Sequence, residues 1–162
     1  MFSTLILSVQ PALASLENKP SGKDLKTSLE VAALKMKSAK NRPRFIMCFC
    51  TGECPGFAKL ELWKLVNFVR NELDVEYAVI HPQLCVTDGD NFLRDLLKDG
   101  DKDRIYVIGG CDPRMQKKMF KDAFTEKGLD FDKQVVSLDL RNMETPEAMK
   151  KVAETIEKLT AS

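Results

Sequence analysis

The stretch Phe45–Phe49, with the sequence FIMCF, is an unbroken apolar run of strand length that follows Pro43. Short continuous apolar runs are typical of strands that are buried on both faces of a parallel sheet. Three more runs of this kind follow it along the chain, and segments with helical periodicity separate them. The region that begins at Phe45 is therefore predicted to alternate between strands and helices.

The order of the predicted elements indicates the fold class. After Phe45–Phe49, strands are expected over Tyr77–Ile80, Arg104–Ile108 and Gln134–Leu138. Helices are expected over 57–73, 91–98 and 113–127, the third closed by Gly128, and a last helix begins at Pro146 with Thr145 as its N-cap. This order predicts an α/β fold, a three-layer sandwich with a four-stranded, mostly parallel sheet of flavodoxin-like or Rossmann-like type.

Residues 1–43 are predicted to form an N-terminal extension, ahead of an α/β domain over 44–162. Apolar residues recur at helical spacing over Lys23–Lys40, which predicts an amphipathic helix there. The first 15 residues contain a short apolar run and an A-x-A-like end, but they lack the basic start of a secretory signal. We therefore expect a cytoplasmic protein.

Length and charge exclude several classes of protein. The 162 residues are 44% hydrophobic and 30% charged, which suits one globular domain with a buried core. Lys and Arg number 25 against 24 Asp and Glu, so no strong field attracts nucleic acid or anionic lipid. No run reaches the ~20 apolar residues that cross a bilayer. We expect neither nucleic-acid binding nor membrane insertion.

Five cysteines occur, at positions 48, 50, 54, 85 and 111, and all lie at or after the ends of predicted strands. Carboxyl ends of parallel strands meet at one edge of a sheet, where functional groups collect. If the first strand lies between the second and third, with neighbours ~5 Å apart, three strands direct thiols to one rim. Cys48 and Cys50 would share a face, separated by ~6.5–7 Å. One polynuclear centre could bridge these thiols.

The cysteine spacing leaves other chemistries open. An odd number, with three cysteines in seven residues, suits metal binding or redox chemistry better than structural disulfides. Zinc would accept four thiolates, although the paired C-x-x-C knuckles of many zinc sites are missing. Disulfide exchange is a further alternative, again without a C-x-x-C motif. The cysteines could also be small buried hydrophobic residues.

The residues around the cysteines add local expectations. Asp112 is predicted to cap a helix whose positive N-terminal end, together with Arg114, favours a thiolate at Cys111. Gly109–Gly110 would let the chain turn tightly before that helix, close to a bulky centre. His81 is interpreted as a turn residue, with ligation of the centre as the alternative.

Two surface features have alternative interpretations. Arg114, Lys117, Lys118 and Lys121 form either a docking face for an acidic redox partner or a solvated helix face. Trp63 lies at helical spacing among aliphatic residues and is predicted to pack in the core.

Three segments resemble the N-terminal domain of the A-type subunit of heterodisulfide reductase and its relatives: Cys48-Phe49-Cys50, Leu84-Cys85-Val86 and Gly110-Cys111-Asp112-Pro113-Arg114-Met115. That family has a C-x-C at the end of the first strand, a lone cysteine after the second and a Cys-Ser-Pro-Arg-Met stretch after the third. The similarity covers about residues 44–145.

This resemblance implies an iron–sulfur domain, with a [4Fe–4S] cluster held by Cys48, Cys50, Cys85 and Cys111. It implies electron transfer to or from a larger redox enzyme subunit or a ferredoxin-like donor, as a subunit or domain rather than a stand-alone enzyme. Thr51 and Asp112 depart from the Gly and Ser of the family, and Cys54 is an additional thiol that could also be a ligand. The alternatives are a cluster-free thiol protein, which binds zinc or exchanges disulfides or persulfides, and an interaction module without a centre.

Overall fold

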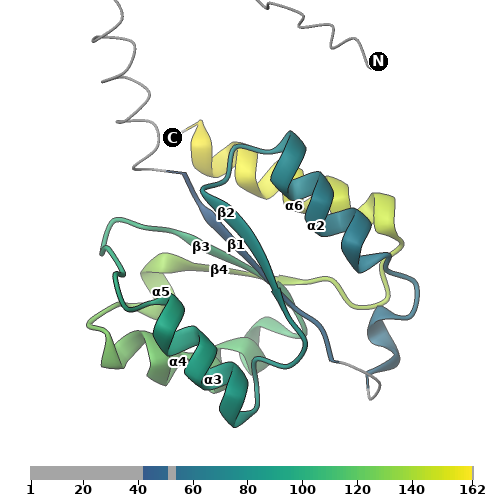
Figure 1. Ribbon diagram of the computed structural model, residues 1–162. Coiled ribbons are helices and arrows are strands. Elements are labelled where there is room, and N and C mark those ends of the chain that lie inside the picture. The colour runs from purple at the N-terminus through teal and green to yellow at the C-terminus, as the bar shows by residue number, and fades with distance from the viewer. Residues whose placement is uncertain (1–41, 51–53, 162) are drawn as a thin grey trace, which may run out of the picture. The chain divides into compact units, whose positions relative to one another are not determined.

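The computed structural model describes residues 42–50 and 54–161, and these form a sheet with helices on both faces (Figure 1). The sheet has four strands, β1 (Arg44–Cys48), β2 (Tyr77–His81), β3 (Tyr106–Gly110) and β4 (Val135–Asp139). The helices are η1 (Pro55–Phe57), α2 (Leu62–Glu72), α3 (Thr87–Leu96), α4 (Pro113–Glu126), α5 (Phe131–Gln134) and α6 (Thr145–Thr160). The helix predicted over Lys23–Lys40 lies outside the described residues.

The strand order is β2-β1-β3-β4, and every neighbouring pair is parallel. The α/β fold and the central place of the first strand are thereby confirmed, and the sheet is wholly parallel rather than mostly parallel. In the register, Cys48 lies opposite His81, and Gly110 lies opposite Asp139. The carboxyl ends of β1, β2 and β3 therefore lie side by side at one edge of the sheet.

Alternate residues of β1 serve two different cores. Phe45 and Met47 pack on the face covered by α2 and α6, whereas Ile46 and Cys48 pack on the face covered by α3 and α4. All four are buried, with exposed fractions between 0% and 6%. Burial on both faces explains why β1 is a continuous apolar run. Cys48 thus lies on the α3–α4 side of the sheet.

The helix predicted over 57–73 is divided in the structure. A short 3₁₀ helix, η1, comes first, and α2 begins only at Leu62. The backbone N–H of Glu61 donates to the Thr145 hydroxyl at 2.8 Å, and Thr145 is the first residue of α6. The prediction of Thr145 as N-cap is therefore wrong, because Glu144 holds that position and the Thr145 side chain joins α6 to the start of α2.

The capping signals of α4 were interpreted correctly. Asp112 is its N-cap and accepts a hydrogen bond from the backbone N–H of Arg114 at 2.8 Å. Gly128 has a φ of 70° just after the C-cap, a conformation that favours glycine. The helix α3, in contrast, begins at Thr87 rather than at 91, because the turn-prone residues 88–90 are helical where Gly89 packs closely on the preceding loop.

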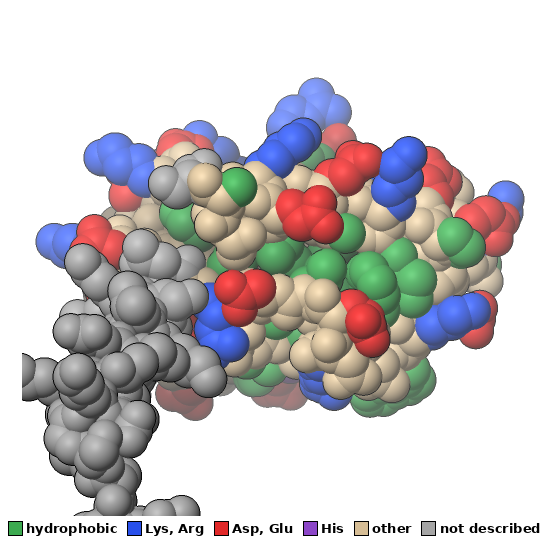
Figure 2. Space-filling model, turned by 90° about the horizontal axis from the view of Figure 1, so that it is seen from above, with side chains coloured by type: hydrophobic (Ala, Val, Ile, Leu, Met, Phe, Trp, Pro, Cys, Tyr) green, Lys and Arg blue, Asp and Glu red, His purple; other side chains and the backbone are tan. Residues whose placement is uncertain are grey.

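Figure 2 shows acidic and basic side chains interspersed on the face that carries α2 and α6. Trp63 of α2 is 65% exposed, so the prediction of a core tryptophan is wrong. The α2 face that packs inward carries Leu65, Val66 and Val69 instead. Within the described part of the chain, every helix is too short or too polar to span a membrane.

Candidate functional site

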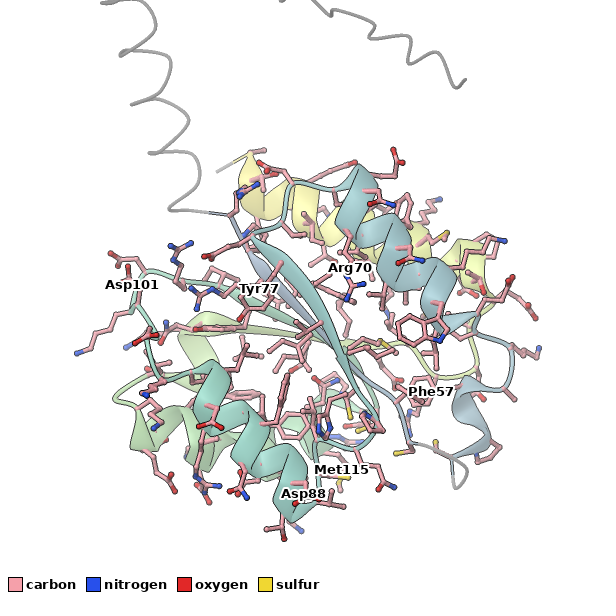
Figure 3. All side chains as sticks on the ribbon, viewed as in Figure 1. Phe57, Arg70, Tyr77, Asp88, Asp101 and Met115 are labelled. Carbon is pink, nitrogen blue, oxygen red and sulfur yellow. The ribbon has the colours of Figure 1, made fainter. Side chains whose placement is uncertain are left out.

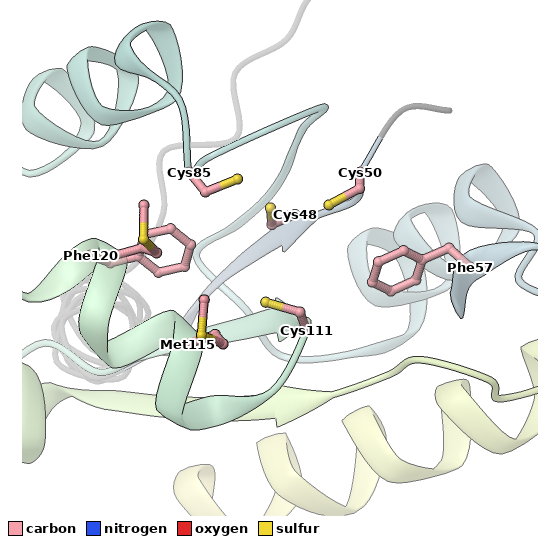
Figure 4. A pocket seen from close by; sticks show the side chains of 8 residues that line it. Cys48, Cys50, Phe57, Cys85, Cys111, Met115 and Phe120 are labelled. Carbon is pink, nitrogen blue, oxygen red and sulfur yellow. The ribbon is translucent and has the colours of Figure 1, made fainter. Parts of the chain in front are cut away.

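A cavity of about 380 Å³ at the carboxyl edge of the sheet is lined by Cys48, Cys50, Cys85 and Cys111. Cys48 ends β1, Cys50 follows it by two residues, Cys85 follows β2 and Cys111 follows β3. In Figure 4 the four sulfur atoms surround one common space. The folded chain thus brings together four cysteines from three strand ends, as the sequence predicted.

Cys48 is the most deeply placed of the four, with an exposed fraction of 6%. The backbone N–H of Leu84 donates to its Sγ at 3.4 Å, which ties the loop after β2 to the end of β1. The N–H of Phe49 donates to the His81 carbonyl at 3.3 Å, so the extended pairing continues past Cys48. Phe49 packs on the α2–α6 core, and Cys48 and Cys50 both line the cavity.

Cys111 is held by a buried glutamine that the sequence did not single out. Gln116 is 1% exposed, and its Nε2 donates to the carbonyl oxygens of Cys111 at 2.7 Å and Leu138 at 3.2 Å. These bonds join the start of α4 to the ends of β3 and β4. The available signal was the position of Gln116 on the inward face of α4, where Phe120 and Phe124 recur at helical spacing.

Cys85 is the exposed member of the set and lies in the turn between β2 and α3. Its neighbour Leu84 is 1% exposed and packs in the core between the sheet and the helices α3 and α4. Gly89 of α3 lies so close to this turn that an added Cβ would stand 2.2 Å from the Gln83 carbonyl oxygen and 2.4 Å from Leu84 Cα. The turn carrying Cys85 is therefore held firmly against α3, although the thiol itself reaches the surface.

Cys54, the fifth cysteine, is placed differently. It precedes η1 and packs, partly buried, against the core under α2 and α6. It is not among the residues that line the cavity. The structure thus separates Cys54 from the other four thiols.

The remaining residues that line the cavity have apolar side chains. Phe57 of η1 and Met115, Met119 and Phe120 of α4 complete the lining. Figure 3 places Phe57 and Met115 toward the carboxyl ends of the strands, away from Tyr77 and Asp101. None of these four lining residues was predicted to belong to the site. Phe57 and Phe120 are buried, whereas Met115 and Met119 are 48% and 39% exposed, so the cavity opens to solvent beside α4.

Burial favours the protonated form of the Cys48 and Cys111 thiols. It raises the pKa of Cys48 to about 12, an effect that the neighbouring thiols reinforce and the Leu84 N–H opposes. Burial also raises the pKa of Cys111, and the Arg141 guanidinium counteracts this. A set of four charged thiolates in this cavity would need a bound cation, since apolar surroundings disfavour uncompensated charge.

The charge expected from Arg114 comes instead from Arg141. Arg114 is 92% exposed at its side chain and pairs with Asp112 at 3.2 Å. Arg141 pairs with Asp139 at 2.6 Å, and its side chain lies so close to η1 that a Cβ on Gly56 would stand 2.9 Å from Arg141 Cγ. Arg141, the second residue after β4, therefore supplies the positive charge near Cys111.

The two glycines before Cys111 belong to β3 rather than to a turn, so the predicted turn at this point is wrong. A Cβ on Gly109 would stand 2.8 Å from Leu140 Cδ1, inside the α2–α6 core. A Cβ on Gly110 would stand 3.5 Å from the Cys48 Cβ. Close packing against Leu140 explains glycine at position 109, whereas the contacts at Gly110 would be ordinary van der Waals contacts.

The other residues considered in the sequence lie outside the cavity lining. His81 stacks on Phe92 with ring centroids 4.9 Å apart, and its Nδ1 accepts from the Gln83 N–H at 3.2 Å. His81 is the last residue of β2, so its interpretation as a turn residue is wrong, although its side chain accepts from the turn that follows. Lys117 pairs with Asp132 at 2.6 Å, so part of the basic face of α4 is already neutralised.

The four thiols are not grouped around a single point. Among the described residues, no group of three or more His, Cys, Asp and Glu side chains is arranged to hold one metal ion. Tetrahedral zinc, with Zn–S bonds of about 2.3 Å, would require sulfurs roughly 3.8 Å apart. A cluster of several iron atoms separates its cysteine ligands further and fills the space between them. The shared cavity and soft donor set fit such a cluster better than one ion.

No family model matches the chain. Among curated proteins, it is similar to A-type iron-sulfur subunits of CoB–CoM heterodisulfide reductase from Methanopyrus kandleri, 26% identical over 72 residues, and Methanocaldococcus jannaschii, 25% identical over 83 residues. The corresponding subunit of the H2/formate:CoB-CoM heterodisulfide,ferredoxin reductase of Methanococcus maripaludis is 27% identical over 84 residues. These matches cover 44% to 51% of this chain and 11% to 12% of each relative. They confirm the resemblance to the A-type subunit.

Proposed function

We propose that Cys48, Cys50, Cys85 and Cys111 bind an iron–sulfur cluster and that the protein transfers electrons. The observation that carries this proposal is the cavity of about 380 Å³ lined by these four thiols from three strand ends. The relatives support it, since two of them are named as iron-sulfur subunits. Four cysteine thiolates are the usual ligand set of [2Fe–2S] and [4Fe–4S] clusters.

We further propose that the cluster is of the [4Fe–4S] type. The cavity is wide, and its lining sulfurs surround a space rather than a point (Figure 4). A mononuclear zinc site has less support, because no group of three candidate ligands among the described residues is arranged for one ion. Cys54 has no part in the proposed ligand set, since it packs against the other core.

Three properties of the protein's own residues affect how a cluster would bind at this site. Phe57 and Phe120 are buried and shield part of the cavity from water, whereas Met115 is 48% exposed at its mouth. The Leu84 N–H, which donates to Cys48 Sγ at 3.4 Å, stabilises negative charge on that sulfur. The raised pKa of Cys48, about 12, means that binding must release a proton from this thiol. When bound, the cluster supplies a one-electron carrier.

Two kinds of partner fit this proposal. One is a larger subunit of a redox enzyme, as the relatives' names describe subunits of a reductase. The other is a ferredoxin-like protein that delivers the electrons. The chain spans about a tenth of the length of the curated relatives it matches, so activity of the whole assembly is part of the proposal.

Reconstitution under anaerobic conditions tests the proposal. The purified chain is incubated with ferrous iron and sulfide, desalted, and analysed for iron, acid-labile sulfide and zinc. We expect about four iron and four sulfide per chain, and a reduced form with an electron paramagnetic resonance signal. About two iron per chain would change the cluster type. A colourless chain that retains zinc and takes up no iron would contradict the proposal.

A further inference from the structure

The four thiols of the cavity differ in their access to solvent. Cys48 is buried, Cys50 and Cys111 are partly buried, and Cys85 is exposed. Figure 4 shows Cys85 approaching the common space from the loop side, apart from β1 and the extended residues after it, which carry Cys48 and Cys50. A ligand set built from these residues would have three sheltered members and one at the surface.

The three sheltered cysteines are also fixed by the backbone around them. Cys48 belongs to β1 and receives the Leu84 N–H at 3.4 Å. The Cys111 carbonyl receives Gln116 Nε2 at 2.7 Å. Cys50 directly follows Phe49, whose N–H is bonded to the His81 carbonyl at 3.3 Å. Withdrawal of the Cys48 thiol would break its hydrogen bond from Leu84, and partial burial restricts the thiols of Cys50 and Cys111.

Cys85 can move without such disturbance. The turn around it is held by buried Leu84 and by the close approach of Gly89, so its backbone stays in place. Its side chain, however, lies at the surface and can leave the cavity by rotation about χ1. Rotations of exposed side chains are among the fastest motions of a folded protein.

A second, smaller hollow of about 190 Å³ lies beside Cys85 and opens toward solvent. Leu84, Cys85, Val86, Thr87, Asp90 and Met119 line it. Cys85 and Met119 also line the main cavity, so the two hollows meet at these side chains. Asp90 is paired with Arg94, which leaves Thr87 as the uncharged polar group of the hollow. Its size and mixed lining suit a small uncharged thiol.

Building on the proposed function, we infer that Cys85 is the exchangeable ligand of the centre and that a small thiol from the adjoining hollow can replace it. In this exchange the iron–sulfur bond to Cys85 breaks and a bond from iron to the incoming sulfur forms. The proton of the incoming thiol passes to Cys85 Sγ. Atoms and charge balance, and nothing is oxidised or reduced. Cys48, Cys50 and Cys111 remain bound throughout.

Alkylation of the loaded protein tests the order of exchange. The reconstituted wild-type chain is treated anaerobically with iodoacetamide, and each cysteine is followed by mass spectrometry. Cys85 should react at least about tenfold faster than Cys48, Cys50 and Cys111, because reactivity follows accessible thiolate. The electron paramagnetic resonance spectrum should change in step with modification of Cys85. Equal rates at the four cysteines, or modification of Cys85 without spectral change, would overturn the inference.

A pair of variants tests replacement by an external thiol. Cys85→Ala should still load iron and sulfide, and 2-mercaptoethanol should shift its spectrum toward that of the wild type. Cys111→Ala is the matched control and should show no such restoration. Failure of Cys85→Ala to load with the thiol present, or equal restoration of both variants, would overturn the inference alone. A wild-type chain without iron and sulfide would overturn the proposed function and this inference together.

Discussion

The two edges of the sheet differ in how their polar side chains are partnered. At the amino edge, Arg44 donates to Glu76 at 2.8 Å and to the Tyr106 hydroxyl at 2.9 Å, and Arg104 donates to the same Glu76 at 2.7 Å. The Arg44 guanidinium also lies 5.3 Å from the centroid of the Tyr77 ring. At the carboxyl edge, four thiols face a cavity whose other walls are apolar.

We interpret the polar cluster at the amino edge as structural and the cavity at the carboxyl edge as a binding site. At the amino edge the Glu76 carboxylate pairs with both arginines, so these charged groups are hydrogen-bonded within the protein itself. The four thiols of the carboxyl edge line one cavity and could bind a common group as thiolates. Burial opposes this charged form, since it raises the pKa of Cys48 to about 12. Their charge would have to be compensated by a bound group. Substitutions at the two edges should therefore have different consequences.

The largest expected effect is the loss of cluster binding on Cys48→Ala. Cys48 is the most buried of the four cavity cysteines, so an external thiol could not reach its place, in contrast to that of the exposed Cys85. Iron and sulfide content after reconstitution should fall at least about tenfold. Cys54→Ala is the matched control, because Cys54 packs outside the cavity, and it should load like the wild type. Equal loss in both variants would contradict the proposed ligand set.

The sheet could be predicted from sequence because its signals are local. Each strand is a short apolar run, and Phe45–Phe49 was displaced by only one residue from the observed β1. The division between η1 and α2 was missed, because it depends on a hydrogen bond between Glu61 and Thr145, which lie 84 residues apart. Trp63 was misplaced for a similar reason, since spacing alone does not show which helix face meets the sheet.

From the sequence, only those residues of the candidate site that lie at the ends of the strands could be predicted. Parallel strands bring Cys48, Cys85 and Cys111 to one edge, and this follows from topology. The roles of Gln116 and Arg141 depend on side chains that meet across different elements. Such contacts leave no periodic signal in the sequence. The family resemblance had set Cys54 apart from the other four cysteines but left it open as a ligand, and its packing against the α2–α6 core is what argues against that role.

A second substitution tests whether the carboxyl edge depends on a rigid loop. Gly89→Ala would place a Cβ 2.2 Å from the Gln83 carbonyl oxygen, so the turn carrying Cys85 must shift. We expect a loss of about 2–3 kcal/mol in the free energy of unfolding and weaker cluster binding. Urea denaturation and iron analysis measure the two effects. Asn91→Ala, at an exposed position of α3, is the control and should change neither. Normal stability of Gly89→Ala would show that the turn adapts.

At the amino edge, Glu76→Gln should weaken the fold and leave cluster binding intact. The glutamate accepts hydrogen bonds from two arginines whose side chains are only 12% and 13% exposed. Loss of its charge should cost about 1.5–3 kcal/mol, the range for hydrogen bonds to charged groups. Urea denaturation of the metal-free chain measures this, and Glu72→Gln on the exposed face of α2 is the control. Loss of iron binding in Glu76→Gln would mean that the two edges are coupled.

The smallest effect is the pH dependence that Glu76 contributes at the amino edge. The hydrogen bond from Arg44 holds the pKa of Glu76 below its usual range, so its contribution is present at neutral pH and is lost as the pH falls through the folded-state value. The stability difference between the wild type and Glu76→Gln should therefore shrink below pH ~4.3, the ordinary glutamate pKa. Urea denaturation of both metal-free chains over an acidic pH series measures it. Cys48, with a pKa raised to about 12, stays protonated throughout that series. A difference that persists unchanged at the lowest pH would show that Glu76 acts through packing rather than charge.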